Sequence, residues 1–147
     1  MNNEIRTLFS FNEITMKLNM SDITQAESLK YPEKGGNCIN WVLGHIVLTR
    51  DLILEMTGNK KLCSENTQKK YKKGSVVIVA SEAEDISELL NKYNRSQEIL
   101  LKVLNEKDFS LEKEVNENLI GLGFHEAYHL GQIGILRRMT GRKSLIG

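Results

Sequence analysis

The chain has 147 residues, of which 27% are charged and 40% hydrophobic, and its formal net charge is +1 with a pI near 7.8. This balance excludes the bulk electrostatic attraction that draws basic proteins to nucleic acid. The two cysteines are too few for a disulfide framework, and no run approaches the ~20 apolar residues of a membrane span or the apolar stretch of a signal peptide. We therefore expect one domain over residues 1–147, cytoplasmic, with neither nucleic acid nor membrane as a partner.

The first predicted helix runs from about Asn3 to Met20. Apolar residues recur along it at helical spacing, at Ile5, Leu8, Phe9 and Met16. The pattern breaks after Met20, and the stretch to Gly36 contains the only proline of the chain. We predict a loop there, with one helical turn between Ile23 and Leu29.

The second predicted helix runs from about Cys38 to Thr57, with Asn37 as its N-cap and Gly58 as its C-terminal stop. Residues 59–81 are then mostly polar and include a basic run at residues 69–73. They also include a short β-prone run at residues 76–80, for which we see no partner strand. We predict a long connection over this stretch.

The third predicted helix runs from about Glu82 to Glu106, with Ser81 as its N-cap and Glu84 completing a capping box. The fourth runs from about Asn118 to Thr140. Its apolar residues surround it almost completely, which predicts the most buried helix of the set. Four helices joined by two long connections predict an all-α bundle that is not a plain up-down-up-down series.

The chain has three histidines, His45, His125 and His129. His125 and His129 stand four apart on one predicted helix, where β-carbons lie about 5–6 Å apart, and His45 comes from another helix. Three protein ligands plus water is the open arrangement of catalytic zinc. A single histidine in a helix more often packs in the core or faces solvent. A ligand role explains all three together, because unpaired imidazoles are costly to bury in apolar helices.

Residues 125–129 also match the H-E-x-x-H motif, in which the glutamate, here Glu126, is the general base of a zinc protease. The extended form of that motif fails, because Gln132 and Ile135 stand where it needs glycine and histidine. No acidic residue follows Glu126, so a third ligand must come from upstream. A di-iron carboxylate site fails as well, because it needs two Glu-x-x-His pairs and Val42 stands three residues before His45.

Two segments, residues 40–46 (Asn-Trp-Val-Leu-Gly-His-Ile) and residues 125–133 (His-Glu-Ala-Tyr-His-Leu-Gly-Gln-Ile), resemble the signature segments of the DinB-like superfamily of small metalloproteins. The resemblance implies a four-helix bundle in up-down-down-up order, with long loops after helices 1 and 2. By motif position it implies that His45, His125 and His129 bind a divalent metal, zinc or nickel. It further implies a homodimer, and a thiol-dependent transferase that uses a low-molecular-weight thiol.

Three functions follow as alternatives. In the first, the metal's open position accepts a small-molecule thiol whose thiolate attacks an electrophile. In the second, water is bound instead and Glu126 acts as the base of a hydrolase. Glu126 lies about 100° around the helix from His125, so it could equally support a ligand histidine or face solvent. In the third, the protein is a stress-related metal- or ligand-binding protein without turnover.

Several neighbouring residues have two interpretations. Trp41 either walls the metal site or packs in the core. Gln132 is the best candidate for a polar contact to a ligand histidine, one turn after His129. The same role is open to Asn40, Tyr93, Asn94 and Gln97. The basic run at residues 69–73 is either a solvated loop or an attractor for an anionic thiol or acidic substrate.

Overall fold

The computed structural model describes residues 2–146, and within that range the chain forms helices and no strand, which confirms the all-α prediction. The helices are α1 (Asn3–Met20), α2 (Gln25–Ser28), α3 (Ile39–Met56), α4 (Glu65–Tyr71), α5 (Ile86–Glu106) and α6 (Lys113–Met139). The four long ones are α1, α3, α5 and α6.

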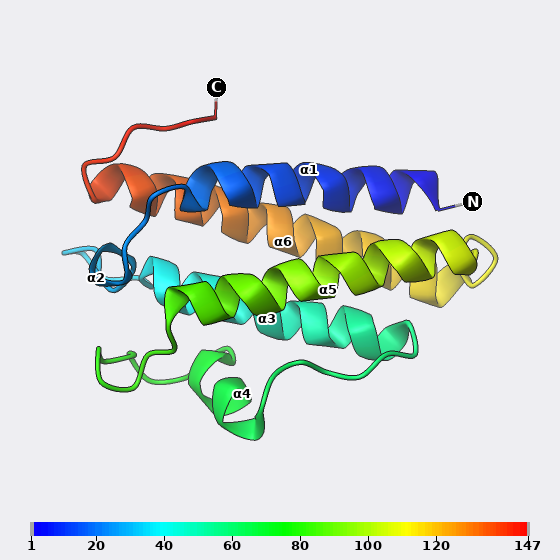
Figure 1. Cartoon of the computed structure of the whole chain (residues 1–147), viewed down its shortest axis with the longest axis horizontal. Helices are drawn as coiled ribbons and strands as arrows, with labels where there is room; N and C mark the ends of the chain where they lie inside the picture. The colour runs from blue at the N-terminus through cyan, green and yellow to red at the C-terminus, as the bar shows by residue number, and fades with distance from the viewer. Residues whose placement is uncertain (1, 147) are drawn as a thin grey trace.

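The four long helices lie side by side, as Figure 1 shows. Helix α6 packs against both α1 and α3, and α5 packs against both α3 and α1. Helices α3 and α5 run in the same direction, opposite to α1 and α6 (Figure 1). The connection from α1 to α3 contains α2, and the longer connection from α3 to α5 contains α4.

The apolar core falls into two clusters. The larger lies around the first half of α3 and includes Trp41, Leu43, Tyr71 and Tyr93. The smaller cluster contains Phe9, Leu104 and Phe109 and lies toward the opposite end of the long helices. Helix α3 contributes to both clusters, and buried residues cover most of its circumference. It is therefore more enclosed than α6, which the sequence predicted to be the most buried helix.

Two predicted N-caps are wrong. The N-cap position of α3 is Cys38, which makes no side-chain cap hydrogen bond, and not Asn37. Helix α5 begins at Ile86, after the predicted cap at Ser81. The Asp85 side chain accepts a hydrogen bond from the backbone N–H of Ser87 and so caps α5. The side-chain amide of Asn40 donates a hydrogen bond to the Glu84 carbonyl oxygen. This tertiary contact opposes an extension of α5 toward its N-terminus.

Helix α6 begins at Lys113 rather than at Asn118. The added turn is held by Val115, which packs against the smaller apolar cluster, next to the fully buried Leu119. Helix α6 ends at Met139 and Gly141 follows with a φ of 89°, close to the predicted stop.

Helix α4 was not predicted, because residues 59–81 carry too few apolar residues to show helical periodicity. It is capped by Ser64, whose side-chain oxygen accepts a hydrogen bond from the Thr67 N–H. Its one fully buried aromatic residue, Tyr71, packs into the larger cluster. The β-prone run at residues 76–80 is not a strand.

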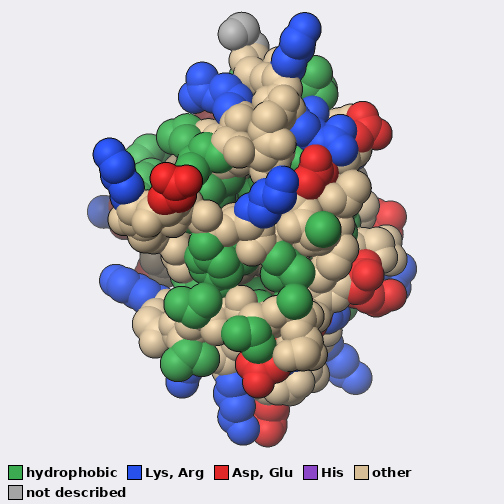
Figure 2. Space-filling model, turned by 90° about the vertical axis from the view of Figure 1, so that its left-hand side faces the viewer, with side chains coloured by type: hydrophobic (Ala, Val, Ile, Leu, Met, Phe, Trp, Pro, Cys, Tyr) green, Lys and Arg blue, Asp and Glu red, His purple; other side chains and the backbone are tan. Residues whose placement is uncertain are grey.

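Figure 2 shows the end of the molecule where α2 lies, with hydrophobic side chains gathered in the middle and charged ones around them. Three exposed valines, at positions 76, 77 and 79, belong to the connection before α5. Within residues 2–146, no helix combines the length and the apolar character needed to cross a bilayer.

Candidate metal centre

The three histidines lie together although they come from two helices. His45 is on α3, and His125 and His129 are on neighbouring turns of α6. One nitrogen of each ring lies within 4.8 Å of the other two, and the Nε2 atoms of His125 and His129 are 3.1 Å apart. The structure thus brings together the three residues singled out from the sequence, and they could hold a metal ion.

The spacing of the nitrogens suits a small dication. Nitrogens bound to zinc at about 2.0–2.1 Å in tetrahedral geometry stand roughly 3.3–3.4 Å apart. The 3.1 Å between His125 Nε2 and His129 Nε2 is close to that value. The three ligand nitrogens lie within 4.8 Å of one another, so any spacing wider than about 3.4 Å would have to shorten for all three to bind one ion.

Two of the rings are held in the tautomer that metal binding needs. His45 Nδ1 lies 2.9 Å from the Tyr71 carbonyl oxygen, which can only accept, so His45 donates from Nδ1. His129 Nδ1 lies 2.7 Å from Gln132 Oε1 and donates in the same way. Each ring therefore presents the lone pair of Nε2. A hydrogen bond from the other ring nitrogen is the usual support of a metal-bound histidine.

The third ring is incompletely partnered. His125 Nδ1 is buried and has no hydrogen-bond partner within the described residues. Leaving a buried polar atom unpaired costs about 1–3 kcal/mol. The cluster as folded therefore leaves this ring nitrogen unsatisfied among the described residues.

The surroundings favour the neutral forms of His125 and His129. Burial lowers the pKa of His125, and the nearby His45 adds to the effect, while Glu126 acts against it. Burial also lowers the pKa of His129, against the opposing hydrogen bond with Gln132. Only the neutral imidazole binds a metal, so both shifts favour a ligand role at neutral pH.

His45 is positioned by the residues that pack around it. Trp41, one turn earlier on α3, stacks on the His45 ring with centroids 4.9 Å apart and planes 11° from parallel. Trp41 thus forms a wall of the candidate site and also packs in the larger core cluster, so both interpretations from the sequence apply. Its indole N–H donates to Ser75 Oγ at 2.8 Å, which ties the connection after α4 to this wall.

Helix α4 supplies the acceptor for His45, and Gly44 makes this contact possible. A β-carbon at position 44 would lie 2.1 Å from a ring carbon of Tyr71, so only glycine lets α4 pack this closely on α3. The Tyr71 hydroxyl donates to Asn40 Oδ1 and accepts from the Glu84 N–H. The tyrosine is therefore fixed at both its backbone and its hydroxyl.

The Glu126 carboxylate, considered from the sequence as a general base, lies in a buried ion pair. It is fully buried, and both of its oxygens accept hydrogen bonds from Arg50, at 2.6 and 2.8 Å. Tyr93 donates to the same carboxylate at 3.0 Å, and Gln97 accepts from Arg50 at 2.7 Å. Burial opposes the charge on Arg50, but Glu126 and Tyr93 outweigh it and raise the pKa of the guanidinium.

The other polar residues considered as partners of the histidines differ in what they contact. Gln132 contacts His129, as proposed from the sequence. Asn40 instead binds the Tyr71 hydroxyl and the Glu84 carbonyl, and Asn94 is exposed. Arg50 was not singled out from the sequence. A buried arginine on an apolar helix was the available signal, since such a charge requires a partner.

Both cysteines are buried and unpaired with each other. Burial, and then the charge of Asp51, raise the pKa of Cys63 to about 12, so its thiol is not a reactive thiolate. Cys38 is fully buried at the start of α3.

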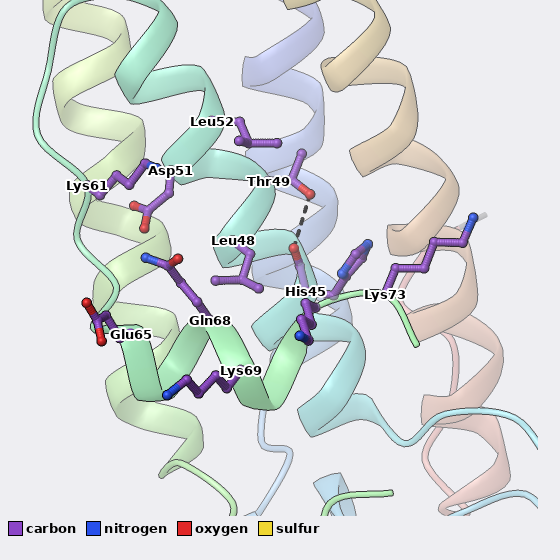
Figure 3. A pocket seen from close by; sticks show the side chains of 11 residues that line it. His45, Leu48, Thr49, Asp51, Leu52, Lys61, Glu65, Gln68, Lys69 and Lys73 are labelled. Carbon is purple, nitrogen blue, oxygen red and sulfur yellow. Dashed lines mark hydrogen bonds between the residues drawn. The ribbon is translucent and has the colours of Figure 1, made fainter. Parts of the chain in front are cut away.

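A cavity of about 560 Å³ opens beside His45 between α3 and α4. Figure 3 shows Leu48 and Leu52 of α3 on one side and Gln68 and Lys69 of α4 on the other. The volume falls within the roughly 300–1,000 Å³ of ordinary ligand pockets. A small molecule in this cavity would contact one of the three histidines directly.

Compared with protein-family models, with curated proteins and with solved structures, the chain shows no match. The resemblance to the DinB-like superfamily therefore remains a prediction from the two motif segments.

Proposed function

We propose that this protein binds one divalent metal ion, zinc or nickel, through His45, His125 and His129 and acts as a thiol-dependent transferase. The observation that carries the proposal is the convergence of three imidazole rings, two of them oriented by acceptors on Nδ1. A bound dication lowers the pKa of a coordinated thiol or water and so supplies a nucleophile near neutral pH.

The residues of the chain perform the other parts of the proposed reaction. His45 and His129 keep their Nε2 lone pairs aimed into the site through their contacts with Tyr71 and Gln132. Trp41 and Leu48 form apolar surface near His45 that limits water around a bound thiol. In the transfer itself, the sulfur forms a bond to an electrophilic carbon as the leaving group departs with the bonding electron pair.

We also propose that the arrangement of α1, α3, α5 and α6 is the up-down-down-up four-helix bundle of the DinB-like superfamily, assembled as a homodimer. The pairwise packing of the long helices and the shared direction of α3 and α5 support the bundle. Light scattering coupled to size-exclusion chromatography tests the homodimer, for which a mass of one chain would be the contrary result.

The hydrolase alternative has less support, because both Glu126 oxygens are engaged by Arg50 and one by Tyr93. A Glu126→Gln protein that keeps its metal and full activity would exclude the base role. The non-catalytic alternative, a stress-related binding protein, shares the metal site and predicts binding without turnover.

Elemental analysis of the untagged protein is the decisive first test. We expect about one equivalent of zinc or nickel in the wild type and its loss in His45→Ala and in His125→Ala. Phe124→Ala is the matched control, because Phe124 precedes His125 on α6 but is exposed. Absence of metal from the wild type, even after incubation with zinc and nickel salts, would refute the proposal.

Metal-loaded protein is then assayed for conjugation of monobromobimane with mercaptosuccinate, mercaptoethanol and cysteine. We expect acceleration over the uncatalysed reaction, lost in His125→Ala. Stable metal binding without acceleration for any thiol or for a second class of electrophile would favour the non-catalytic alternative.

A further inference from the structure

The cavity beside His45 is lined by more positive than negative side chains. Its lining comprises four lysines, two carboxylates, His45, Leu48, Thr49, Leu52 and Gln68; the lysines are Lys61, Lys69, Lys72 and Lys73, and the carboxylates are Asp51 and Glu65. The lysines come from three places: before α4, within it and after it. Three of these lysines belong to the basic run at residues 69–73, and the fold brings Lys61 to the same cavity.

The negative side chains compensate this charge only in part. Asp51 is buried, and its two oxygens accept hydrogen bonds from the N–H groups of Leu62 and Cys63, at 2.7 and 3.0 Å. Its carboxylate therefore holds the chain before α4 in place. Lys61 pairs with Glu55, at 3.2 Å and outside the cavity lining.

The other three lysines remain available. Within residues 2–146, Lys69, Lys72 and Lys73 form no ion pair. Figure 3 shows Lys73 beside His45, and Lys69 farther along α4. Three of the four lysines that line the cavity are thus free to pair with a bound anion.

The cavity also offers an apolar surface between these charges. Leu48 is half-buried, and Leu52 exposes 48% of its surface, on the α3 side of the cavity. A ligand that joins an anionic group to a short carbon skeleton would bury the skeleton against these leucines. Its charge would then lie at the lysines while its other end reaches His45.

We propose that this cavity is the subsite for an anionic group, a carboxylate or a phosphate, on the small molecule that reaches the three histidines. The proposal rests on the proposed function for the identity of the histidine site, and it names the substrate class: acidic small molecules rather than neutral or cationic ones. Lysine ammonium groups bind both kinds of anion as point charges.

The test compares two thiols that differ in charge, mercaptosuccinate with two carboxylates and mercaptoethanol with none. Dissociation constants for both are measured on cobalt-loaded protein at low ionic strength, from the thiolate-to-cobalt absorption band. Because the two thiols differ in intrinsic acidity, the informative quantity is the change in the ratio of their dissociation constants when the protein is altered.

The variant is the double substitution Lys69→Gln with Lys73→Gln. We expect the dissociation constant of mercaptosuccinate to rise about tenfold relative to that of mercaptoethanol, with the effect shrinking as salt is added. The matched control is Lys102→Gln with Lys113→Gln, which changes the net charge equally at exposed sites outside this cavity. We expect it to leave the ratio within about twofold.

The outcomes separate the two proposals. An unchanged ratio in the Lys69 and Lys73 variant, with mercaptoethanol still bound to cobalt, would overturn the anionic subsite and leave the proposed function standing. An equal change in the control variant would also overturn it, because the effect would then be that of net charge. If cobalt is held but neither thiol produces the band, the proposed thiol chemistry fails, and binding of succinate by calorimetry, lost in the same variant, then tests the subsite by itself.

Discussion

Two polar clusters lie along the same pair of helices, α3 and α6, and they are built in opposite ways. In the cluster of Arg50 and Glu126, every charged atom has a partner within the chain, and Tyr93 and Gln97 complete the network. In the histidine cluster, burial favours the neutral forms of His125 and His129, and within residues 2–146 the buried Nδ1 of His125 has no hydrogen-bond partner. The first cluster is complete as folded, whereas the second is not.

The comparison also separates residues that are neighbours in sequence. Glu126 directly follows His125, yet it points into the ion pair with Arg50 and not at the other histidines. It thus fixes the rotation of α6 about its axis, and with it the direction in which His125 and His129 point. A residue of the ion pair and a candidate metal ligand are thus adjacent within a single helical turn.

The largest expected effect comes from breaking the complete cluster. Arg50→Met leaves the buried Glu126 carboxylate without its cation, and we expect the metal-free protein to lose about 3–5 kcal/mol in its free energy of unfolding. Urea denaturation measures the loss. The double variant Arg50→Met with Glu126→Leu removes both charges and should recover most of the stability. If the double variant were no more stable than the single one, the ion pair would not be the reason for the loss.

A smaller effect is expected where α4 meets α3. Gly44→Ala places a methyl group against the Tyr71 ring, and we expect about 1–3 kcal/mol of destabilisation from overpacking. The affinity for metal should fall as well, because the Tyr71 carbonyl moves away from His45. Gly131→Ala on α6 is the matched control, since nothing lies within 4 Å of its added carbon. Equal losses of stability in the two variants would argue against this close contact.

Gln132→Leu tests the incomplete cluster without removing a ligand. The substitution deletes the acceptor for His129 Nδ1, and we expect the affinity for metal to fall by about 10–100-fold with little change in unfolding. Gln132→Glu keeps an acceptor oxygen and should restore most of the affinity. Competition with a chromophoric chelator measures both. Unchanged affinity in Gln132→Leu would remove Gln132 from the site.

The smallest expected effect is a dependence on pH that only the histidine cluster should show. The pKa values of His125 and His129 are lowered in the folded protein, chiefly by burial, so the unfolded chain binds protons first as the pH falls. The stability of the metal-free protein is therefore full above about pH 6.5, the ordinary histidine value, and decreases as the pH falls through the folded pKa values.

Urea midpoints at about pH 7.5 and pH 5 measure this decrease. The carboxylate of Glu27, held by Arg142, has a pKa lowered to about 2 and titrates well below that window. A variant with His125→Asn and His129→Asn should lose less stability over the same interval. An equal loss in this variant would assign the pH dependence to other groups.

The long helices were predictable from sequence because each buries an apolar stripe, and the bounds of α1 were predicted correctly. The histidines were predictable because spacing on a helix determines which side chains are neighbours. Helix α4 was not predictable in this way, because Tyr71 is its one fully buried aromatic residue and the surrounding stretch shows no helical periodicity. The role of Glu126 depended on its partner Arg50, which lies 76 positions earlier in the chain, a pairing that local pattern does not encode.

The acceptor for His45 is a main-chain carbonyl, that of Tyr71, and this has a consequence for any survey of single substitutions. No replacement of the side chain at position 71 deletes that oxygen, so the contact itself would leave no signature among tolerated and rejected residues. Such a survey would report Gly44 and the packing of the Tyr71 ring, and the hydrogen bond would have to be inferred from them. One hydrogen bond that orients a candidate ligand is thus made by the main chain, and side-chain substitutions at position 71 do not remove its acceptor.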